Sequence, residues 1–116
     1  MKKRVQPLLV LSTAEKLAEA EQIAQVLVGE RLAACVNLLP QIDSRYWWEG
    51  KIQSGQEVLM LIKTTSARLP ALTRRIKALH SYTTPEVIAL PIVGGSADYL
   101  NWLTSSTRPS KTKKRI

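Results

Sequence analysis

One histidine and one cysteine are the residues of this chain best suited to metal binding. His80 and Cys35 lie far apart in the sequence, and each is the single residue of its type among the 116. Structural zinc sites use about four such ligands, and a thiol within an apolar segment is ordinarily a core side chain. His80 is therefore the candidate metal ligand, although its position near the end of a predicted helix equally suits hydrogen bonding to the last carbonyls.

The small number of histidine and cysteine residues also argues against catalysis. A Ser or Cys nucleophile needs a neighbouring base, and the sequence offers one imidazole and no Gly-x-Ser-x-Gly motif. Gly94-Gly95 lacks the further glycines and the lysine of a phosphate-binding loop. Several carboxylates show no pairing motif, so we expect them at the surface, in caps or in turns: Asp43, Glu49, Glu57, Glu86 and Asp98. We predict a protein that is not an enzyme.

Length and composition indicate one folded domain. The chain is 45% hydrophobic and 22% charged, which is typical of a globular protein and argues against a disordered or collagen-like chain. No stretch approaches the roughly 18 consecutive apolar residues of a membrane span, and no export signal is recognisable. Because the single cysteine cannot form an internal disulfide, these features predict a cytoplasmic protein.

The net charge of +8 is concentrated at the two ends of the chain. Segments 1–6 and 107–116 hold no acidic residue and these basic ones: Lys2, Lys3, Arg4, Arg108, Lys111, Lys113, Lys114 and Arg115. The prediction is a basic N-terminal tail (1–6), a single domain (7–106) and a basic, flexible C-terminal tail (107–116). Such tails aid solubility or make weak contacts with anions, and we favour this over a dedicated nucleic-acid reader.

Apolar runs and turn residues predict four strands. They are expected over 7–11, over 32–39 with an extension to 48, over 57–65 and over 87–93. A turn at 49–51 and a loop at 53–56 separate the second and third strands, which should form a long hairpin. Pro91 indicates an edge position or a bulge in the fourth strand.

Three helices complete the pattern. Ser12 should cap a helix that ends near Gly29, Ser66 one that ends near Leu79, and Ser96 a short helix that ends at about residue 105. The resulting order is that of an α+β fold, the ferredoxin-like βαββαβ sandwich, with an additional C-terminal helix.

Two helices can cover only one face of a four-stranded sheet. The strands are rich in Leu, Ile, Val and Met, so the other face should be apolar as well, and we expect further copies of the chain to cover it in an obligate oligomer. RNA-recognition domains share this element order, but they stack bases on aromatic residues of the central strands. Segments 8–11 and 58–62 contain no aromatic residue, which disfavours nucleic-acid binding.

Five short motifs in sequence resemble the CutA divalent-cation tolerance family: ERLAACVN at 30–37, YWWEGK at 46–51, KTT at 63–65, YTTPE at 82–86 and DYLNWL at 98–103. Together they extend over about residues 7 to 105. The resemblance implies a ferredoxin-like subunit in a tight trimer of high stability, assembled through the long hairpin. It also implies a cytoplasmic protein without an established enzymatic activity.

The resemblance bears on copper as well. Some bacterial members of the family bind copper through a Cys after the first strand and a His-His pair before a Pro-Tyr step. Here Ser12 replaces the Cys, Leu79 replaces the first His and Ser81 replaces the Pro, which leaves His80 alone. A hydroxyl is a poor substitute for a thiolate toward copper, so we expect weak binding of copper or another divalent metal.

The family is also similar in fold to the nitrogen-regulatory PII signalling trimers, whose ligands lie in clefts between subunits. By this resemblance the candidate cleft residues are Lys63, Trp48, Tyr82 and Glu86. Lys63 could pair with a carboxylate or phosphate, and Glu86 could orient that lysine or bind a cation, while the aromatic rings form walls. An ion pair between Lys63 and Glu86 that locks the trimer is the alternative.

The resemblance therefore predicts a homotrimeric divalent-cation tolerance protein involved in the response to metal ions. The alternative function is a PII-like signalling trimer that binds a small anionic ligand between its subunits.

Overall fold

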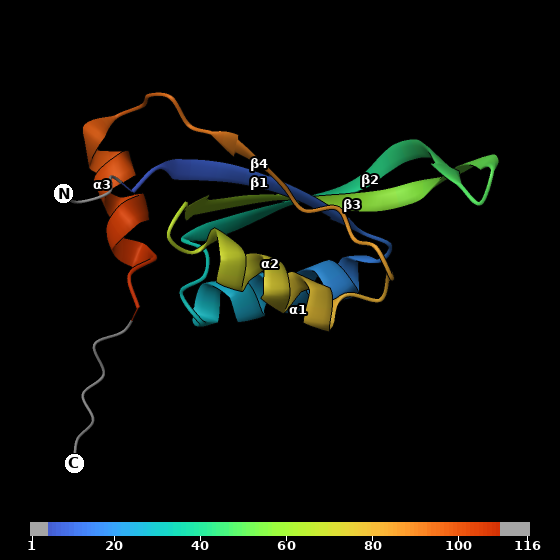
Figure 1. Cartoon of the computed structure of the whole chain (residues 1–116), viewed down its shortest axis with the longest axis horizontal. Coiled ribbons are helices and arrows are strands. Elements are labelled where there is room, and N and C mark those ends of the chain that lie inside the picture. Colours follow the sequence, from blue (N-terminus) through green and yellow to red (C-terminus); the bar gives the residue numbers. More distant parts are fainter. Residues whose placement is uncertain (1–4, 110–116) are drawn as a thin grey trace, which may run out of the picture.

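Seven elements follow one another in the predicted order (Figure 1). The computed structural model describes residues 5–109. The elements are β1 (Pro7–Ala14), α1 (Leu17–Gly29), β2 (Cys35–Trp48), β3 (Lys51–Thr65), α2 (Leu69–Leu79), β4 (Ile88–Pro91) and α3 (Ala97–Ser106). The strands form one antiparallel sheet in the order β2-β3-β1-β4, which confirms the ferredoxin-like fold, with β4 and its Pro91 at an edge.

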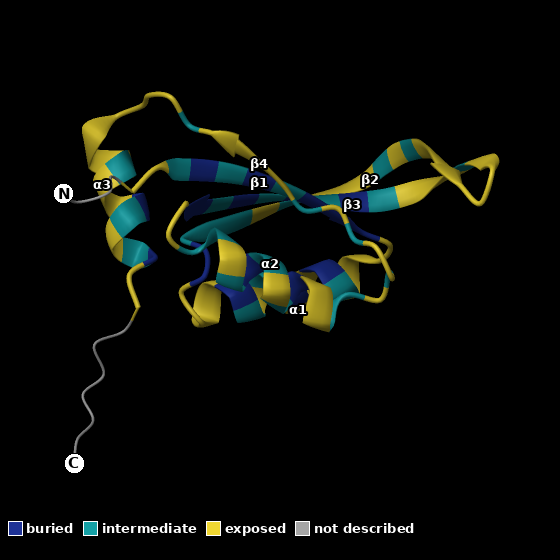
Figure 2. Cartoon of the chain, viewed as in Figure 1, coloured by how far each residue is buried: buried dark blue, intermediate teal, exposed yellow. Residues whose placement is uncertain are grey.

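The hydrophobic core lies between the sheet and the first two helices. Alternate strand residues such as Val10, Met60 and Ile62 are fully buried there, against the buried apolar stripes of α1 and α2: Ala20, Ile23, Leu27, Leu72 and Ile76. Both helices lie on the same side of the sheet, and Figure 2 shows the buried positions concentrated between these layers. The predicted one-sided cover is confirmed.

The opposite face of the sheet is apolar, and none of the helices that the structure describes lies over it. Since side chains alternate along a strand, this face carries a row of leucines from the two central strands: Leu9, Leu11, Leu59 and Leu61. Ile88 and Leu90 of β4 continue the row and are about half exposed, at 52% and 45%. Helix α3 lies at one end of the sheet (Figure 1) and leaves this face open.

Strands β2 and β3 form the long hairpin, which extends beyond the two helices (Figure 1). Its turn is the predicted one, with Glu49 and Gly50 both at positive φ, as a tight two-residue turn requires. The loop expected at 53–56 is wrong, because these residues pair in register with 43–46 of β2 and continue β3 to Lys51. Their polar composition is compatible with a strand that has solvent on both faces.

Two predicted helix caps are wrong and one is confirmed. Ser12 does not start α1, because β1 continues through Ala14, in register with β3, and the helix begins at Leu17. Ser66 does not cap α2, which begins at Leu69; its Oγ instead accepts a hydrogen bond from the Gln6 backbone N–H at 3.0 Å. Ser96 does cap α3 by accepting a hydrogen bond from the Tyr99 N–H. Local capping signals were overridden where strand pairing competed for the same residues.

Most of the predicted basic tails, residues 1–4 and 110–116, lies outside the described residues. Of the tail residues inside, Gln6 and Thr107 are tied to the domain, while Val5, Arg108 and Pro109 are exposed. The Gln6 amide donates to the Ile92 carbonyl at 2.9 Å, and Thr107 is buried, with its hydroxyl 3.2 Å from the Leu103 carbonyl. Within residues 5–109, every helix is too short or too polar to cross a membrane.

Replacement of Ser12 by Ala should raise the free energy of unfolding by about 1 kcal/mol, because a buried, unpaired hydroxyl is desolvated without compensation. Within residues 5–109, Ser12 Oγ is the one buried side-chain nitrogen or oxygen without a hydrogen-bond partner. Denaturant unfolding measures the change. Thr64→Val is the matched control, because Thr64 is equally buried but its hydroxyl donates a hydrogen bond to the Leu32 carbonyl at 2.7 Å. Its free energy of unfolding should fall by about 1 kcal/mol. A Ser12→Ala protein less stable than wild type would contradict this assignment.

Candidate functional site

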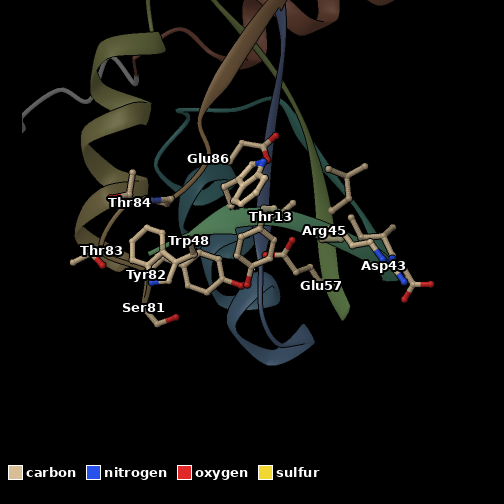
Figure 3. Close-up of a pocket in the computed structure, with 16 residues that line it drawn as sticks. Thr13, Asp43, Arg45, Trp48, Glu57, Ser81, Tyr82, Thr83, Thr84 and Glu86 are labelled. Carbon is tan, nitrogen blue, oxygen red and sulfur yellow. The ribbon is translucent and has the colours of Figure 1, made fainter. Parts of the chain in front are cut away.

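A cavity of about 950 Å³ lies between the outer half of the hairpin and the loop that follows α2 (Figure 3). The hairpin contributes residues 42–48 of β2 together with Glu57 and Leu59 of β3. The loop contributes residues 81–86, and Thr13 of β1 lies between the two walls. The cavity is therefore lined by three segments that are distant in sequence. Pairing in the sheet joins β1 to the hairpin, and hydrogen bonds of His80 and Tyr82 hold the loop beside them.

A β-bulge in β2 sets which hairpin residues face the cavity. The register slips between Leu39 and Ile42, and Gln41 adopts a positive φ of 65°. One extra residue in a strand reverses the alternation of side chains beyond it. As a result Tyr46 and Trp48 share a face with Glu57, on the side of the sheet that the helices leave open.

His80 holds the loop at the end of β1. Its side chain is fully buried, with Nε2 2.7 Å from the Thr13 carbonyl oxygen and Nδ1 3.0 Å from the Tyr82 backbone nitrogen. A carbonyl can only accept and an amide N–H can only donate, so these contacts assign the proton to Nε2. Glu19 of α1 reinforces the loop by accepting hydrogen bonds from the Ser81 N–H at 2.7 Å and the Ser81 hydroxyl at 3.1 Å.

Tyr82 and Glu57 are joined across the cavity wall. The Tyr82 hydroxyl donates a hydrogen bond of 2.7 Å to Glu57 Oε2. Partial burial of the phenol, together with the adjacent Glu57 carboxylate, raises the pKa of Tyr82 above its ordinary value. The phenol is thus a stable donor that holds the Glu57 carboxylate in place at the cavity.

Glu86 is the second carboxylate of this site. Burial raises the pKa of Glu86 above the ordinary value of 4.5, and the negative charge of Glu57 raises it further. Sequence reasoning placed Glu86 near a ligand cleft, through the resemblance, but left Glu57 among the carboxylates expected at the surface, in caps or in turns. They share a cavity only because β3 and the loop after α2 meet there. The feature of the sequence that could have predicted this is the register of the hairpin, which fixes the face on which Glu57 lies.

Three of the four residues predicted for a ligand cleft line this cavity, namely Trp48, Tyr82 and Glu86. Lys63 does not: it lies further along β3, where its Nζ donates a hydrogen bond of 2.8 Å to Asn37 Oδ1. No ion pair joins Lys63 to Glu86 in the part of the chain that the structure describes. Since the predicted anion partner lies elsewhere, the arrangement does not favour the small anionic ligand; a ligand role for the other three residues stays a prediction.

His80 lies behind the cavity rather than in its lining. Residues 5–109 contain no group of three or more His, Cys, Asp or Glu side chains placed to hold a metal ion. Both ring nitrogens of His80 already have a protein partner, so a metal ion would have to displace one of these hydrogen bonds. The buried Ser12 hydroxyl, which the resemblance to the family aligns with a copper-binding Cys, offers a hard oxygen rather than a thiolate. These residues do not fit a preformed copper site.

The antiparallel βαββαβ sheet with its long hairpin places the chain among the ferredoxin-like α+β proteins. Comparison narrows this class to one family. The family model for the CutA1 divalent ion tolerance protein matches residues 8–106, and the chain belongs to this family.

Relatives of the chain include the divalent-cation tolerance protein CutA of Thermus thermophilus, which is 50% identical over 99 residues, 85% of this chain and 96% of that protein. The chloroplastic protein CutA 1 of rice is 49% identical over 106 residues, which are 91% of this chain but 60% of that longer protein. The solved structure of the Thermus thermophilus divalent cation tolerance protein matches with a TM-score of 0.86 at 48% identity, covering 88% of this chain and 99% of that one.

Replacement of Glu86 by Gln should raise the thermal midpoint at about pH 7 and have no effect at about pH 4. A carboxyl whose pKa is raised on folding destabilises the folded state once it ionises. For Glu86 this loss of stability begins as the pH rises through 4.5, the ordinary pKa, and is complete above the raised pKa of the folded state. The charged groups that line the same cavity are Asp43, Arg45 and Glu57. Glu21→Gln, an exposed carboxylate of α1 outside this cavity, serves as the control and should change the midpoint little at either pH. A Glu86→Gln midpoint below wild type at neutral pH would refute the expectation.

Proposed function

We propose that the chain functions as a homotrimer in the cellular response to divalent cations, by binding rather than by catalysis. The observation that carries the oligomer is the uncovered apolar face of the sheet, on which Leu61 of β3 lies next to Leu11 of β1. Exposed apolar patches of this kind are typical of subunit interfaces. The number of subunits, three, rests on the resemblance to the family, and the long hairpin is the element proposed to join neighbouring subunits.

Membership of the family supports the link to divalent cations. The matched family and the Thermus relative are both named for divalent-ion or divalent-cation tolerance, and neither name describes a reaction. For this chain we propose that copper or another divalent metal binds only weakly, through His80, since the imidazole must first give up a hydrogen bond.

The cytoplasm is the compartment we propose. Its support is the single cysteine, Cys35, which cannot form a disulfide within the chain and is therefore compatible with a reducing compartment. The name of the rice relative assigns that protein to the chloroplast, and the name of a solved relative from Archaeoglobus fulgidus calls that protein periplasmic, so the family is not restricted to one compartment.

Replacement of Leu61 by Lys should disrupt the trimer, because it places a charge at the centre of the apolar face. Sedimentation velocity at micromolar concentration is expected to give a trimer for wild type and a smaller species for Leu61→Lys. Val28→Lys is the control: Val28 is 41% exposed on α1, in the opposite layer, so this variant should remain trimeric. A wild-type protein that sediments as a compact monomer would rule out the proposed oligomer.

Titration with Cu(II), Zn(II) and Cd(II) tests the metal proposal. Calorimetry should give millimolar dissociation constants for wild type and values about tenfold weaker for His80→Ala, because one imidazole per subunit is a poor site on its own. The folded state of the variant is checked by circular dichroism, since His80 also holds the loop. Equal affinities for the two proteins would remove His80 as a ligand, and submicromolar binding would contradict a weak site.

A further inference from the structure

Two strongly basic segments of the chain, 1–6 and 107–116, meet the folded domain at one junction. The first segment is held beside the turn before α2 by a pair of hydrogen bonds. The Gln6 N–H donates to Ser66 Oγ at 3.0 Å, and the Ser66 N–H donates to the Gln6 carbonyl at 2.8 Å. Segment 1–6 therefore joins the domain beside Ser66, two residues before Arg68.

The second segment starts beside Arg31, which lies in the loop between α1 and β2. Arg31 Nη1 donates a hydrogen bond to the carbonyl of Ser106, the last residue of α3, at 3.1 Å. The Arg31 carbonyl in turn accepts a hydrogen bond from Arg68 Nε at 3.3 Å. The two arginines thus connect the starting points of both basic segments, and we call Arg31, Ser66, Arg68 and Ser106 the helix junction.

The helix junction lies apart from the surfaces proposed to join subunits. Figure 1 shows the start of β1, the end of α1, the start of α2 and helix α3 at one end of the molecule, away from the tip of the hairpin. Arg31 follows the end of α1 and Arg68 precedes α2, so both belong to the helix layer. The apolar row around Leu61 lies on the opposite face of the sheet. A trimer assembled through that face and the hairpin does not need to cover the junction.

The positive charge gathered at the helix junction has no counterpart from the chain. Segments 1–6 and 107–116 hold eight of the 17 lysines and arginines and no acidic residue. Arg31 and Arg68 add two guanidinium groups, and neither forms an ion pair in the part of the chain that the structure describes. More than half of the basic residues of the chain are therefore attached to, or part of, one junction.

The two junction arginines keep most of their hydrogen-bonding capacity for an external anion. A guanidinium has five N–H donors, and Arg31 and Arg68 each use one of them in the contacts above. The acidic neighbour of Arg31 in the sequence, Glu30, is already engaged, because both of its carboxylate oxygens accept hydrogen bonds of 2.9 Å from Arg75. The planar donor fork of arginine matches phosphate oxygens in particular.

The composition of the basic segments narrows the kind of anion. Segments 1–6 and 107–116 contain no aromatic residue, so they cannot stack on unpaired bases and have no Trp or Tyr to anchor at a membrane interface. What they offer is charge, and double-stranded nucleic acid carries one negative charge per about 1.7 Å of helix axis. A rod with such closely spaced phosphates can contact the junction and both segments together.

We propose that the helix junction and the two basic segments bind the phosphate backbone of double-stranded nucleic acid without sequence preference. Arg31 and Arg68 contribute contacts in fixed positions, and the lysines and arginines of segments 1–6 and 107–116 add contacts around them. This mode differs from base recognition on the sheet, which the lack of aromatic residues in the central strands disfavours. The inference goes beyond the proposed response to divalent cations and does not rest on it.

Fluorescence anisotropy of labelled DNA duplexes, titrated with the full chain, tests the proposal. Two short duplexes of unrelated sequence should bind with equal affinity, with dissociation constants of about 1 to 100 μM at physiological salt. Contacts with about six phosphates should make the affinity fall about 10³-fold between about 50 and 200 mM salt, because bound counterions are released. Phosphatidylserine vesicles and polyglutamate, which represent a membrane and an acidic protein, should bind more weakly at the same salt concentration.

Variants locate the binding at the helix junction. Arg31→Gln combined with Arg68→Gln should lower the slope of log affinity against log salt by about 2, since each phosphate contact contributes about 1. Arg31→Lys combined with Arg68→Lys keeps both charges and should retain the wild-type slope. Lys16→Gln combined with Lys77→Gln is the matched control, because these exposed lysines lie at the far ends of α1 and α2. The control should also retain the wild-type slope.

A further variant measures the share of the second segment. Replacement of Lys111, Lys113 and Lys114 by Gln removes three charges without shortening the chain and should lower the slope by about 3. Circular dichroism and sedimentation velocity confirm that each variant keeps the fold and the oligomeric state of wild type before titration.

Four results would overturn the proposal: no binding of either duplex at about 50 mM salt, a strong preference for one duplex sequence, tighter binding of vesicles or polyglutamate than of DNA, or an unchanged slope for the Arg31→Gln, Arg68→Gln protein. Each can occur whether or not the chain is a trimer and whether or not it binds copper. Failure of this inference is therefore distinguishable from failure of the proposed function.

Discussion

The alternation of side chains along the central strands is the constraint on which the rest of this structure depends. The residues of β1 and β3 that point toward the helices, such as Val10 and Ile62, are fully buried. Their neighbours Leu9 and Leu61 point the other way, and no helix within residues 5–109 lies over them. A strand that is apolar at every position needs cover on both faces, and two helices supply it on one. The open face therefore gives the strongest physical reason for association between copies of the chain.

The cavity depends on two local departures from regular structure. The bulge near Gln41 redirects the side chains of β2, so that aromatic residues of the hairpin face the same side as Glu57. The loop after α2 lies beside these residues, because the buried His80 ring binds the carbonyl of Thr13 at the end of β1. His80 has a clear structural role in this arrangement, as the residue that positions Tyr82. Both ring nitrogens of His80 are thus engaged in hydrogen bonds within the chain.

Family membership and local chemistry address different questions. The match over residues 8–106 establishes the family, and the relatives share the whole ferredoxin-like architecture. It does not identify a ligand, since the names of the family and of the Thermus relative refer only to tolerance of divalent ions. The composition of the cavity provides independent information. Its lining combines aromatic rings with the carboxylates of Asp43, Glu57 and Glu86.

The sequence by itself determined the order of elements, the hairpin turn, the edge position of Pro91 and the one-sided cover of the sheet, because hydrophobic periodicity and turn residues act over short distances. It misplaced the starts of α1 and α2 and the loop at 53–56, where pairing with a distant strand outweighed local capping and polarity. It also grouped Lys63 with Glu86, which the structure separates, and left Glu57 outside the site. Only the tertiary structure decided that Glu57, Glu86 and the hairpin aromatics share one cavity. The bulge in β2, the register of the strands and the loop held by His80 bring these residues together. None of the three is determined by neighbouring residues in the sequence alone.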